Sequence, residues 1–416
     1  MTLKIYHIGL QGYGRLGFEH LVELVNHGPV EAELCGVCSH DPDELESAEK
    51  FARAHEIEIQ TFQDVHEMYT DASEQDGRVF VYDTGSSDTH SDNLYRSLQH
   101  GFYHLAERPP SLSREEHLRE RKLSENSDVT WKVDFIEREN PVVRKAEELL
   151  EGTDVEAIRT YRFSSKAVEA ALIPQRRREL RGGTVLKQAI NEVYVMDFLD
   201  AAGVEPSLDI ESAETNYYTP FREGSDKLLS IEGGYVEDLD EKAAEADLSA
   251  RFSAGTVEVE INSGWLGLSN RAMARISELQ EISGHDFRHR DFVEADGRAF
   301  VDERAAFFVI EGDRNLAGDL IEGKLFDLES GKEIETDYRI HTPLYRVIED
   351  AARDAAGQGK KQLDVETDRF MDALFDAREQ LDAGEYMEEL KKANSRLESM
   401  VVEDTENQGK NLSVPS

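Results

Sequence analysis

Hydrophobic and polar positions follow one pattern in the first third of the chain and another pattern after it. In the first part, short apolar runs alternate with amphipathic stretches, which is typical of βαβ units around a parallel sheet. The predicted strands are Leu3–Gly9, Glu33–Cys38, Val79–Asp83 and Phe102–Ala106. The predicted helices are Phe18–Asn26, Asp43–His55, Asp92–His100 and Arg114–Asp128. Residues 1–128 are therefore predicted to form an α/β domain.

Strands dominate the later part of the chain between Ile210 and Ile310. Thr256–Ile261 alternates polar with apolar residues, which predicts a strand with one wet face, as in an open antiparallel sheet. The other predicted strands are Glu156–Ser164, Ile210–Tyr218, Asp247–Phe252 and Phe307–Ile310, and the predicted helices are Pro141–Leu150, Gly182–Ala202, His341–Ala356 and Val365–Ala383. We expect an α+β domain over residues 129–384 with a mainly antiparallel sheet. We also expect a C-terminal helix that returns to the first domain, and an acidic polar tail over 385–416.

The chain of 416 residues is strongly acidic, with 87 Asp and Glu against 47 Lys and Arg, a formal net charge of −40. This field repels phosphate backbones and anionic lipids, which argues against nucleic-acid and membrane-surface binding. The composition resembles that of salt-accumulating haloarchaea, and we interpret it as a marker of habitat. No apolar run approaches the roughly 20 residues of a membrane helix, and the first residues lack the layout of a signal peptide. We expect a soluble, cytoplasmic enzyme with a small-molecule substrate.

A glycine-rich turn joins the first predicted strand to the first predicted helix. Its glycines have the spacing G-x-G-x-x-G, which in this position is typical of a dinucleotide-binding Rossmann domain. Gly12 makes the tight turn, Gly14 lets the backbone reach a pyrophosphate, and Gly17 lets the helix pack on the strand. The helix N-terminus then offers free N–H groups to the anion. The predicted cofactor contacts in this segment are Gly12, Tyr13, Gly14, Arg15, Leu16 and Gly17.

The end of the second predicted strand favours one nicotinamide cofactor over the other. A dinucleotide site usually has an acidic residue here, which binds the adenosine ribose hydroxyls. This chain has Ser39 followed by His40, a neutral hydroxyl and a side chain that can carry a positive charge. Neither would repel a 2′-phosphate, so NADP is favoured over NAD at Ser39 and His40. NAD remains the alternative if Asp41 turns toward the ribose.

Later motifs follow one another in a recognisable order. Val79–Asp83 runs into Thr84-Gly-Ser-Ser-Asp-Thr-His90, and Glu107-Arg-Pro109 follows the next strand. Three further segments come next: Arg138-Glu-Asn-Pro141, a helix opened by Arg181-Gly-Gly183, and a strand pair that begins at Asp247. In this order they resemble the T-P-x-x-x-H, E-K-P, R-F-x-P, G-G-G-x-x-x-D-x-G-x-H and D-x-x-x-x-x-F-x-x-G motifs of the glucose–fructose oxidoreductase, inositol dehydrogenase and MocA (Gfo/Idh/MocA) family. The resemblance spans residue 3 to about residue 380, and residues 270–340 match poorly.

The resemblance implies a Rossmann domain followed by an α+β domain with an open, mainly antiparallel sheet. The active site would lie between the two domains, and subunits would associate through that sheet into a homo-oligomer. The implied reaction is hydride transfer between NAD(P) and a hydroxyl or carbonyl of a polyol, sugar or sugar-like acid. The additional cofactor contacts that it implies are Gly85, Ser86, His90 and Glu107.

The catalytic residues of that family are replaced in this chain. The lysine of E-K-P is Arg108, the aspartate and histidine of the central helix fall on Lys187 and Asn191, and Tyr194 lies three residues further on. Because Lys187, Asn191 and Tyr194 have the spacing i, i+4 and i+7, we expect them on one helix face, in the cleft that Arg108 enters. Arginine is a poor proton donor, since its pKa stays above about 12. We predict that Arg108 is a fixed cation near the reacting oxygen and that Lys187 or Tyr194 supplies the proton.

The same replacements leave a second interpretation open. In this interpretation, a chain that has lost the family's catalytic set binds a dinucleotide as a sensor or assembly partner and turns over no substrate. The replacements are large, polar and clustered, which favours an active oxidoreductase. A third class, a scaffold that binds no nucleotide, would show no change in NAD(P)H fluorescence on mixing.

Two arginines are predicted to bind substrate. Arg138 lies at the expected domain junction, and Arg178 ends a dense basic run that begins at Gln175. Such a run suits a carboxylate or phosphate group of the substrate. A solvated loop paired with nearby acids is the alternative.

Two groups of residues have the side chains of a metal site, and we predict a metal at neither. Cys35 and Cys38 form C-x-x-C, but residues three apart on a strand point to opposite faces and no second pair completes a zinc site. We expect buried structural cysteines. His285, Asp286 and His289 lie in the poorly matching segment and are predicted to form a surface segment.

Overall fold

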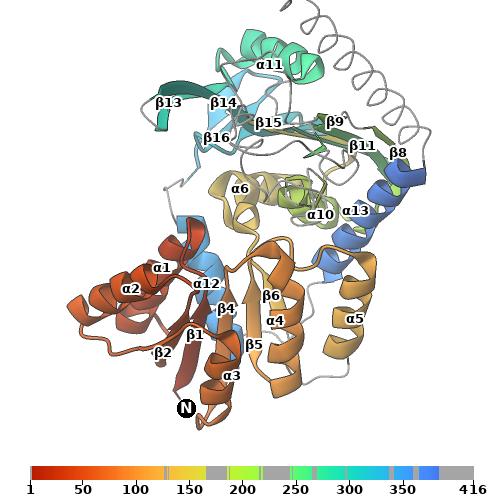
Figure 1. Cartoon of the computed structure of the whole chain (residues 1–416). Helices are drawn as coiled ribbons and strands as arrows, with labels where there is room; N and C mark the ends of the chain where they lie inside the picture. The colour runs from red at the N-terminus through yellow and green to blue at the C-terminus, as the bar shows by residue number, and fades with distance from the viewer. Residues whose placement is uncertain are drawn as a thin grey trace, which may run out of the picture.

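Two sheets, each packed against helices, form the two domains of the protein (Figure 1). The computed structural model describes residues 2–125, 129, 131–164, 185–186, 188–214, 217–218, 244–245, 247–264, 269–295, 298–336, 342–358 and 365–383. A parallel-sheet Rossmann-like domain precedes a domain with a mostly antiparallel sheet, so the predicted fold class is confirmed. Within the described residues, none of the helices combines the length and the apolar character needed to cross a membrane.

The first sheet has the strand order β3-β2-β1-β4-β5-β6, and every neighbouring pair is parallel. Its strands are β1 (Leu3–Ile8), β2 (Ala32–Cys38), β3 (Gln60–Phe62), β4 (Arg78–Asp83), β5 (Tyr103–Ala106) and β6 (Trp131–Val133). Its helices are α1 (Tyr13–His27), α2 (Pro42–Ala54), α3 (Val65–Ser73), α4 (Ser87–His100) and α5 (Arg114–Glu125). The short elements β3 and α3 were not predicted. Because β6 belongs to this sheet, the sheet extends past the boundary predicted at residue 128.

The helix α12 (Thr342–Ala355) returns to the first domain, as the sequence predicts. Its apolar residues Leu344, Ile348 and Ala352 are buried in one core with residues of β1, β2, β4, α1 and α2. Figure 1 shows this helix, in light blue, beside α1. The amphipathic spacing of α12 is what allows a segment more than 200 residues away to complete this core.

The second sheet has nine strands, eight of them in the order β17-β16-β15-β14-β7-β12-β11-β8, with β13 paired to β14. Only the pair β7 and β12 is parallel. The strands are β7 (Val155–Ser164), β8 (Asp209–Glu214), β11 (Asp247–Ala254), β12 (Val257–Gly264), β13 (His289–Ala295), β14 (Arg298–Gly312), β15 (Leu316–Asp319), β16 (Lys324–Asp327) and β17 (Lys332–Ile334), and β9 (Tyr217–Tyr218) pairs separately with β10 (Ala244–Glu245). The helices of this part are α6 (Pro141–Leu150), α10 (Tyr194–Ala201), α11 (Asn270–Ser283), α13 (Val365–Ala383) and the 3-10 helices η1 (Ile136–Glu139) and η3 (Ala189–Val193).

Helices cover both faces of the second sheet. One face packs against α6, α10 and α13, and its buried residues include Ile158, Phe252 and Phe308. On the other face, α11 buries Ile276 and Leu279 against strand residues. The segment that matches the family poorly therefore supplies a helix that covers part of a face predicted to be open (Figure 1). The poor match hid this helix, which was not predicted.

Candidate active site

A cleft of about 1390 Å³ lies between the two domains, at the carboxyl ends of the parallel strands. From the first domain it is lined by loop residues that follow β1, β2, β4 and β5. From the second domain it is lined by residues of η1, β7, η3 and β14. Ligands of doubly wound sheets bind at this edge, where the strand order reverses between β1 and β4.

The glycine-rich turn leaves room for a ligand at Gly12. Gly12 has φ 55°, a conformation that favours glycine, and a Cβ added there would meet no atom within 4 Å. The first turn of α1 contains no acidic residue and no side-chain cap, although the N–H groups of Gly14 and Arg15 donate to the carbonyl oxygens of Gln11 and Gly12 at 2.9 and 3.2 Å. The positive end of the helix therefore has no competing carboxylate in its first turn, which suits an anion. These features fit the pyrophosphate of a dinucleotide.

The other glycines of the turn serve packing within the protein. A Cβ on Gly14 would lie 2.7 Å from the carbonyl oxygen of Gly9, and a Cβ on Gly17 would lie 2.6 Å from the ring of Tyr82. Gly9 itself has φ 86° and touches Thr84, whose hydroxyl donates to the carbonyl oxygen of Gly9 at 3.0 Å. The expectation that Gly17 lets the helix pack on a strand is confirmed. Gly14 instead allows close contact between its own loop and Thr84 in the loop after β4. The close contact between Gly9 and Thr84 was not predicted. A glycine directly after the first strand was the feature that could have indicated it.

Most of the predicted cofactor residues line the cleft, and three do not. Those that line it are Gly12, Tyr13, Gly14, Leu16, Ser39, His40, Gly85, Ser86 and Glu107. Arg15 instead pairs with Glu19 at 2.9 Å, and its guanidinium lies over the ring of Phe51. Gly17 faces Tyr82, and His90 is fully buried beneath the loop surface. The prediction that these three contact a cofactor is not supported by their positions.

An acidic residue does reach the end of β2, but from the neighbouring helix. The hydroxyl of Ser39 donates to Glu44 at 2.7 Å, and both residues line the cleft. Asp41 caps α2 by accepting the N–H of Asp43 at 2.9 Å, so its carboxylate already has a structural role. Glu44 was missed because it belongs to the first turn of α2 and not to the strand end, where an acid is usually sought.

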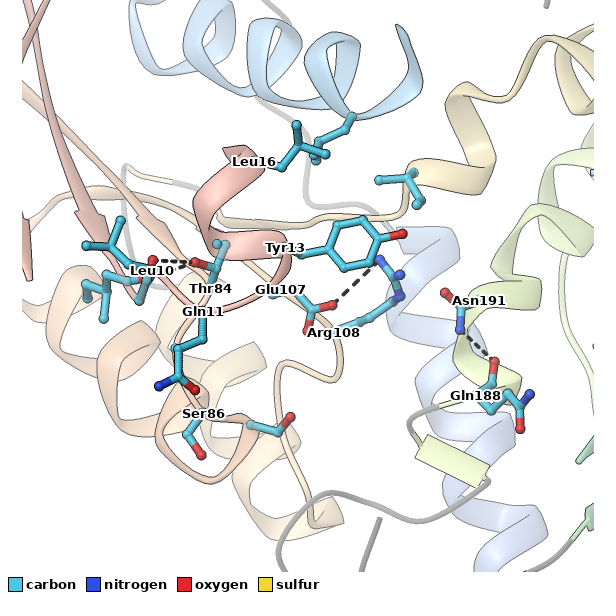
Figure 2. A pocket seen from close by; sticks show the side chains of 18 of the residues that line it. Leu10, Gln11, Tyr13, Leu16, Thr84, Ser86, Glu107, Arg108, Gln188 and Asn191 are labelled. Atoms are coloured by element: carbon cyan, nitrogen blue, oxygen red, sulfur yellow. Dashed lines mark hydrogen bonds and ion pairs between the residues drawn. The ribbon is translucent and has the colours of Figure 1, made fainter. Parts of the chain in front are cut away.

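Arg108 occupies the inner end of the cleft. One of its Nη atoms donates to the carbonyl oxygen of Asp134 at 2.8 Å, and Glu107 lies 3.9 Å from the same nitrogen. Burial works against the charge, but Glu107, Asp134 and Tyr13 more than offset it and hold the pKa of Arg108 above its ordinary value. Figure 2 shows Tyr13 beside Arg108, with Asn191 on the opposite side of the cleft. The position suits a permanent cation facing a ligand oxygen.

The structure separates the residues that were predicted to share one helix face. Lys187 lies outside the described residues. Asn191 lines the cleft and donates from Nδ2 to the carbonyl oxygen of Gln188 at 2.8 Å. Tyr194 is fully buried in the core against Phe198 and is not part of the cleft wall.

The expectation that Tyr194 enters the cleft is therefore wrong. The prediction assumed one continuous α-helix, in which residues spaced i, i+4 and i+7 share a face. The chain instead forms the 3-10 helix η3 up to Val193 and starts α10 at Tyr194, so this spacing no longer places Tyr194 on the same face as Asn191. The Tyr194 hydroxyl donates to the buried carboxylate of Glu192. Burial, reinforced by Glu192, raises its pKa well above the ordinary value. A proton donor at this position has no path to a ligand.

A buried ion-pair network supports the wall of the second domain. Arg162 of β7 donates to Glu192 at 2.5 Å and to Glu137 at 2.9 Å, and Arg162 and Glu137 line the cleft. Burial opposes the charge of Arg162, yet the two carboxylates raise its pKa. The cleft-lining Gln188 donates from Nε2 to carbonyl oxygens of β7 and β12, and its buried Oε1 has no hydrogen-bond partner among the described residues. Sequence reasoning missed this network, whose members come from three separate elements.

The two predicted substrate arginines do not form part of the described cleft. Arg138 makes a two-pronged ion pair with Asp197 of α10, at 2.8 Å from Nε and 2.5 Å from Nη2, and it does not line the cleft. It joins η1 to α10 behind the wall. Arg178 and the basic run around it lie outside the described residues.

The segment around His285 is not a surface segment as predicted. His285 and His289 each place Nε2 2.8 Å from the same carboxylate oxygen of Asp319, which is fully buried. The other oxygen of Asp319 accepts the N–H groups of Ile321 and Glu322. Since Ile321 lines the cleft, this cluster supports the cleft wall.

The two cysteines lie on β2, and the prediction that they point to opposite faces is wrong. The register of β1 with β2 shifts between Ile5 and Tyr6, so the strand carries an extra residue at Cys35. Cys35 and Cys38 consequently pack against the same apolar cluster. Burial raises the pKa of Cys35 to about 11 and of Cys38 to about 12, so both stay protonated thiols, as expected of structural cysteines.

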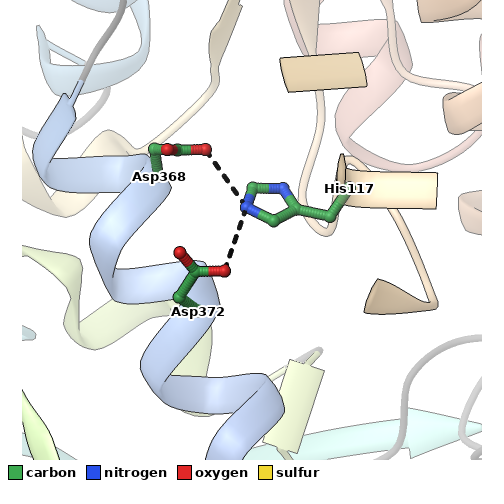
Figure 3. Close-up of side chains that lie close together, drawn as sticks. All are labelled: His117, Asp368 and Asp372. Carbon is green, nitrogen blue, oxygen red and sulfur yellow. Dashed lines mark ion pairs between the residues drawn. The ribbon is translucent and has the colours of Figure 1, made fainter. Parts of the chain in front are cut away.

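His117, Asp368 and Asp372 lie close enough together to share a metal ion, from α5 of the first domain and α13 of the second part (Figure 3). Nε2 of His117 is 3.1 Å from Asp368. The guanidinium of Arg121 donates to both carboxylates at 2.8 and 2.7 Å, and Arg114 adds a second cation. Because arginine already neutralises these acids, we interpret the cluster as an ion-pair contact between α5 and α13.

No family model matches this chain, and no curated protein sequence matches it. Solved structures do match over nearly the whole chain. Myo-inositol 2-dehydrogenase from Lactobacillus plantarum is 14% identical with a TM-score of 0.62, and the match covers 92% of this chain and 97% of that one. UDP-N-acetylglucosamine 3-dehydrogenase GnnA from Acidithiobacillus ferrooxidans is 14% identical with a TM-score of 0.57, over 91% of this chain and 98% of that one. Levoglucosan dehydrogenase in complex with NADH and levoglucosan is 12% identical with a TM-score of 0.63, over 91% and 97%. The chain therefore has the fold that these dehydrogenases share.

Proposed function

We propose that this protein is a nicotinamide-dependent oxidoreductase that transfers hydride to or from a hydroxyl or carbonyl of a polyol, sugar or sugar-like acid. The observation that carries the proposal is the open space at Gly12, at a helix start without a side-chain cap, in a cleft whose other end holds Arg108. The dehydrogenases with the same fold support it, since one of them is described with NADH and a sugar derivative.

The cofactor would lie along the first-domain wall of the cleft. Backbone at Gly12 and Tyr13 would hold its phosphates, and residues at the end of β2 would hold its adenosine end. When bound, the group supplies a hydride donor or acceptor. Residues of this chain do the rest, by orienting the substrate and stabilising charge on its reacting oxygen.

The polar groups that line the cleft suit a hydroxyl-rich substrate. Arg108 offers fixed positive charge to a developing alkoxide, and the amide of Asn191 lines the same cleft, where its oxygen can accept from a hydroxyl group. Hydrogen bonds of this kind discriminate strongly against substrates that lack the matching group. With Tyr194 in the core, Lys187 is retained as the proposed proton donor.

We further propose that the cofactor is NAD and not NADP. The sequence favours NADP only because Ser39 stands where an acidic residue is expected at the end of β2. Glu44 lies against Ser39 at the same end of the cleft, and its charge would repel a 2′-phosphate while accepting hydrogen bonds from ribose hydroxyls.

We also propose a homo-oligomer, and we place its contact on one part of the second sheet. The part of the second sheet that α11 leaves open carries ion-paired residues such as Arg159 and Glu258, 3.6 Å apart, with Arg251 nearby. A contact there would join charged surfaces. Light scattering in low and high salt tests it, since a mass of 47.1 kDa under all conditions would remove the oligomer.

The proposed function is tested by calorimetric titration with NADH and NADPH in concentrated KCl, followed by a panel of polyols and sugar acids monitored through NAD(P)H absorbance. We expect NADH binding, and turnover that is lost in Lys187→Ala. Binding without turnover of any panel member would support the silent dinucleotide-binding alternative. If neither cofactor bound, the proposal would be wrong.

A further inference from the structure

His90 joins two loops that face the inner end of the cleft. The residue lies in α4 and is fully buried. Its Nδ1 is 2.9 Å from the carbonyl oxygen of Pro109, and its Nε2 is 3.0 Å from the carbonyl oxygen of Gly85. Pro109 directly follows Arg108, and Gly85 belongs to the loop after β4 that lines the cleft. The ring thus contacts the backbone of both loops without entering the cleft.

Both neighbours of the His90 ring are hydrogen-bond acceptors. A neutral imidazole carries a hydrogen on only one nitrogen, so one of the two contacts would oppose a lone pair to a carbonyl oxygen. A ring that is protonated on both nitrogens donates to both carbonyl groups, and donors that carry charge form the stronger hydrogen bonds. The geometry therefore favours an imidazolium.

A buried cation requires a buried anion nearby, and Asp83 fits this role. This residue ends β4 and is fully buried, with its carboxylate accepting the N–H of Gly85 and the side-chain amide of Asn93, both at 2.9 Å. Burial raises the pKa of Asp83, and the charge of His90 is the largest effect that opposes the shift.

The other titratable groups around Asp83 do not replace His90 as its partner. His104 lies 4.0 Å from the carboxylate, but burial and the charge of His90 lower its pKa to about 3, so it stays neutral. Glu107 adds negative charge on the cleft side, and its carboxylate faces Arg108. His90 is then the one described group that both contacts the loops and balances Asp83.

We propose that His90 is a positioning residue that is protonated on both ring nitrogens, is balanced by Asp83, and fixes the Gly85 loop relative to Arg108. Its effect on a cofactor rests on the proposed function, whereas its protonation does not. The two statements therefore need separate measurements.

The first measurement is nitrogen-15 NMR of the full chain labelled at its 13 histidines, near neutral pH and without cofactor. The signals of His90 are assigned by their loss in His90→Gln. We expect both of its ring nitrogens to carry hydrogen, and we expect Asp83→Asn to return the ring to the neutral form. One protonated nitrogen in the wild-type chain would overturn the proposal. If His90→Gln does not fold, His90→Asn provides the assignment.

The second measurement is NADH affinity by fluorescence. His90→Gln removes one of the two loop contacts, and we expect roughly tenfold weaker NADH binding, the size of one charged hydrogen bond. His100→Gln, at the exposed end of the same helix, is the control and should leave the affinity unchanged. An unchanged affinity in His90→Gln would overturn the positioning role. If the wild-type chain does not bind NADH, the proposed function fails and the NMR result still decides the protonation.

Discussion

The two walls of the cleft are built on different principles. The wall from the first domain consists of consecutive loop residues whose backbones touch, such as Gly9 against Thr84 and Gly14 against Gly9. The wall from the second domain depends on charged side chains from distant elements, with Arg162 held between Glu137 and Glu192. The first wall is therefore fixed by the absence of side chains, and the second by electrostatic balance between buried ones. Substitutions should damage the two walls in different ways.

The largest effect on cofactor affinity is expected from Gly14→Ala. The added Cβ would approach the carbonyl oxygen of Gly9 to 2.7 Å, and backbone has little freedom to move away. We expect the free energy of unfolding to fall by about 1–3 kcal/mol and cofactor affinity to fall at least about 100-fold, because the anion-binding turn is displaced. Chemical unfolding and calorimetry measure the two quantities.

Gly101→Ala is the matched control for this comparison. Gly101 ends α4 with φ 72°, and an added Cβ would meet open space. Only the cost of a left-handed residue is expected, about 1 kcal/mol, with cofactor affinity unchanged. Equal affinities in Gly14→Ala and Gly101→Ala would show that the first wall does not hold the cofactor.

A larger loss of stability than in Gly14→Ala, without a steric clash, is expected from Arg162→Met. The substitution leaves Glu192 fully buried without its cation, and breaking a buried pair costs about 3–5 kcal/mol. The double change Arg162→Met with Glu192→Met should recover much of the loss, because neither charge remains. Arg53→Met removes an exposed pair with Glu49 and should cost less than about 1 kcal/mol. Additive losses in the double variant would contradict the electrostatic account of the second wall.

Sequence reasoning predicted the strand, the turn and the helix that frame the first wall, because their determinants are local. The glycines and the strand before them specify the turn, and the apolar spacing of α12 identified a helix that returns to the first domain. It failed for Tyr194 because the change from 3-10 to α-helix at Val193 has no local signal in spacing alone. The pairing of Arg162 with Glu137 and Glu192 was not predictable for a related reason. Partners 25 and 30 residues away are brought together by the packing of η1, η3 and β7, and local spacing does not reveal that packing.

A moderate effect is expected from Glu44→Ala, where a side chain lies against Ser39 in the first wall. Removing its carboxylate takes away the repulsion of a 2′-phosphate, so the ratio of NADPH to NADH affinity should rise roughly tenfold. The control is Glu46→Ala on the same helix, where the carboxylate pairs with Lys50 in solvent. Parallel titrations with both cofactors measure the ratio. A ratio that is the same in Glu44→Ala and wild type would mean that the cofactor choice is made elsewhere.

The smallest effect is expected behind the second wall, in His289→Gln, and it should depend on pH. Burial acts against the charged ring, but Asp319 and Glu322 outweigh it and raise the pKa of His289 above 6.5. A raised pKa means that the folded state binds the proton more tightly, so this stabilisation is complete below pH 6.5 and is lost as the pH rises through the folded value. The cost of His289→Gln should therefore be about 1 kcal/mol in mild acid and should shrink in alkali.

The stability lost in Asp319→Asn should depend on pH differently from the stability lost in His289→Gln. Comparing the two variants therefore tests whether charge stabilises this part of the second wall. Burial would raise its pKa, but hydrogen bonds from His285 and His289 lower it below 3.8. Its stabilisation is present above that value, so the cost of Asp319→Asn should persist from mild acid to alkali. The contrary outcome is a loss of unfolding free energy in His289→Gln that stays constant from mild acid to alkali. In that case hydrogen-bond geometry, and not charge, would hold Ile321 in the cleft wall. The electrostatic account of the second wall would then not include the cluster around Asp319.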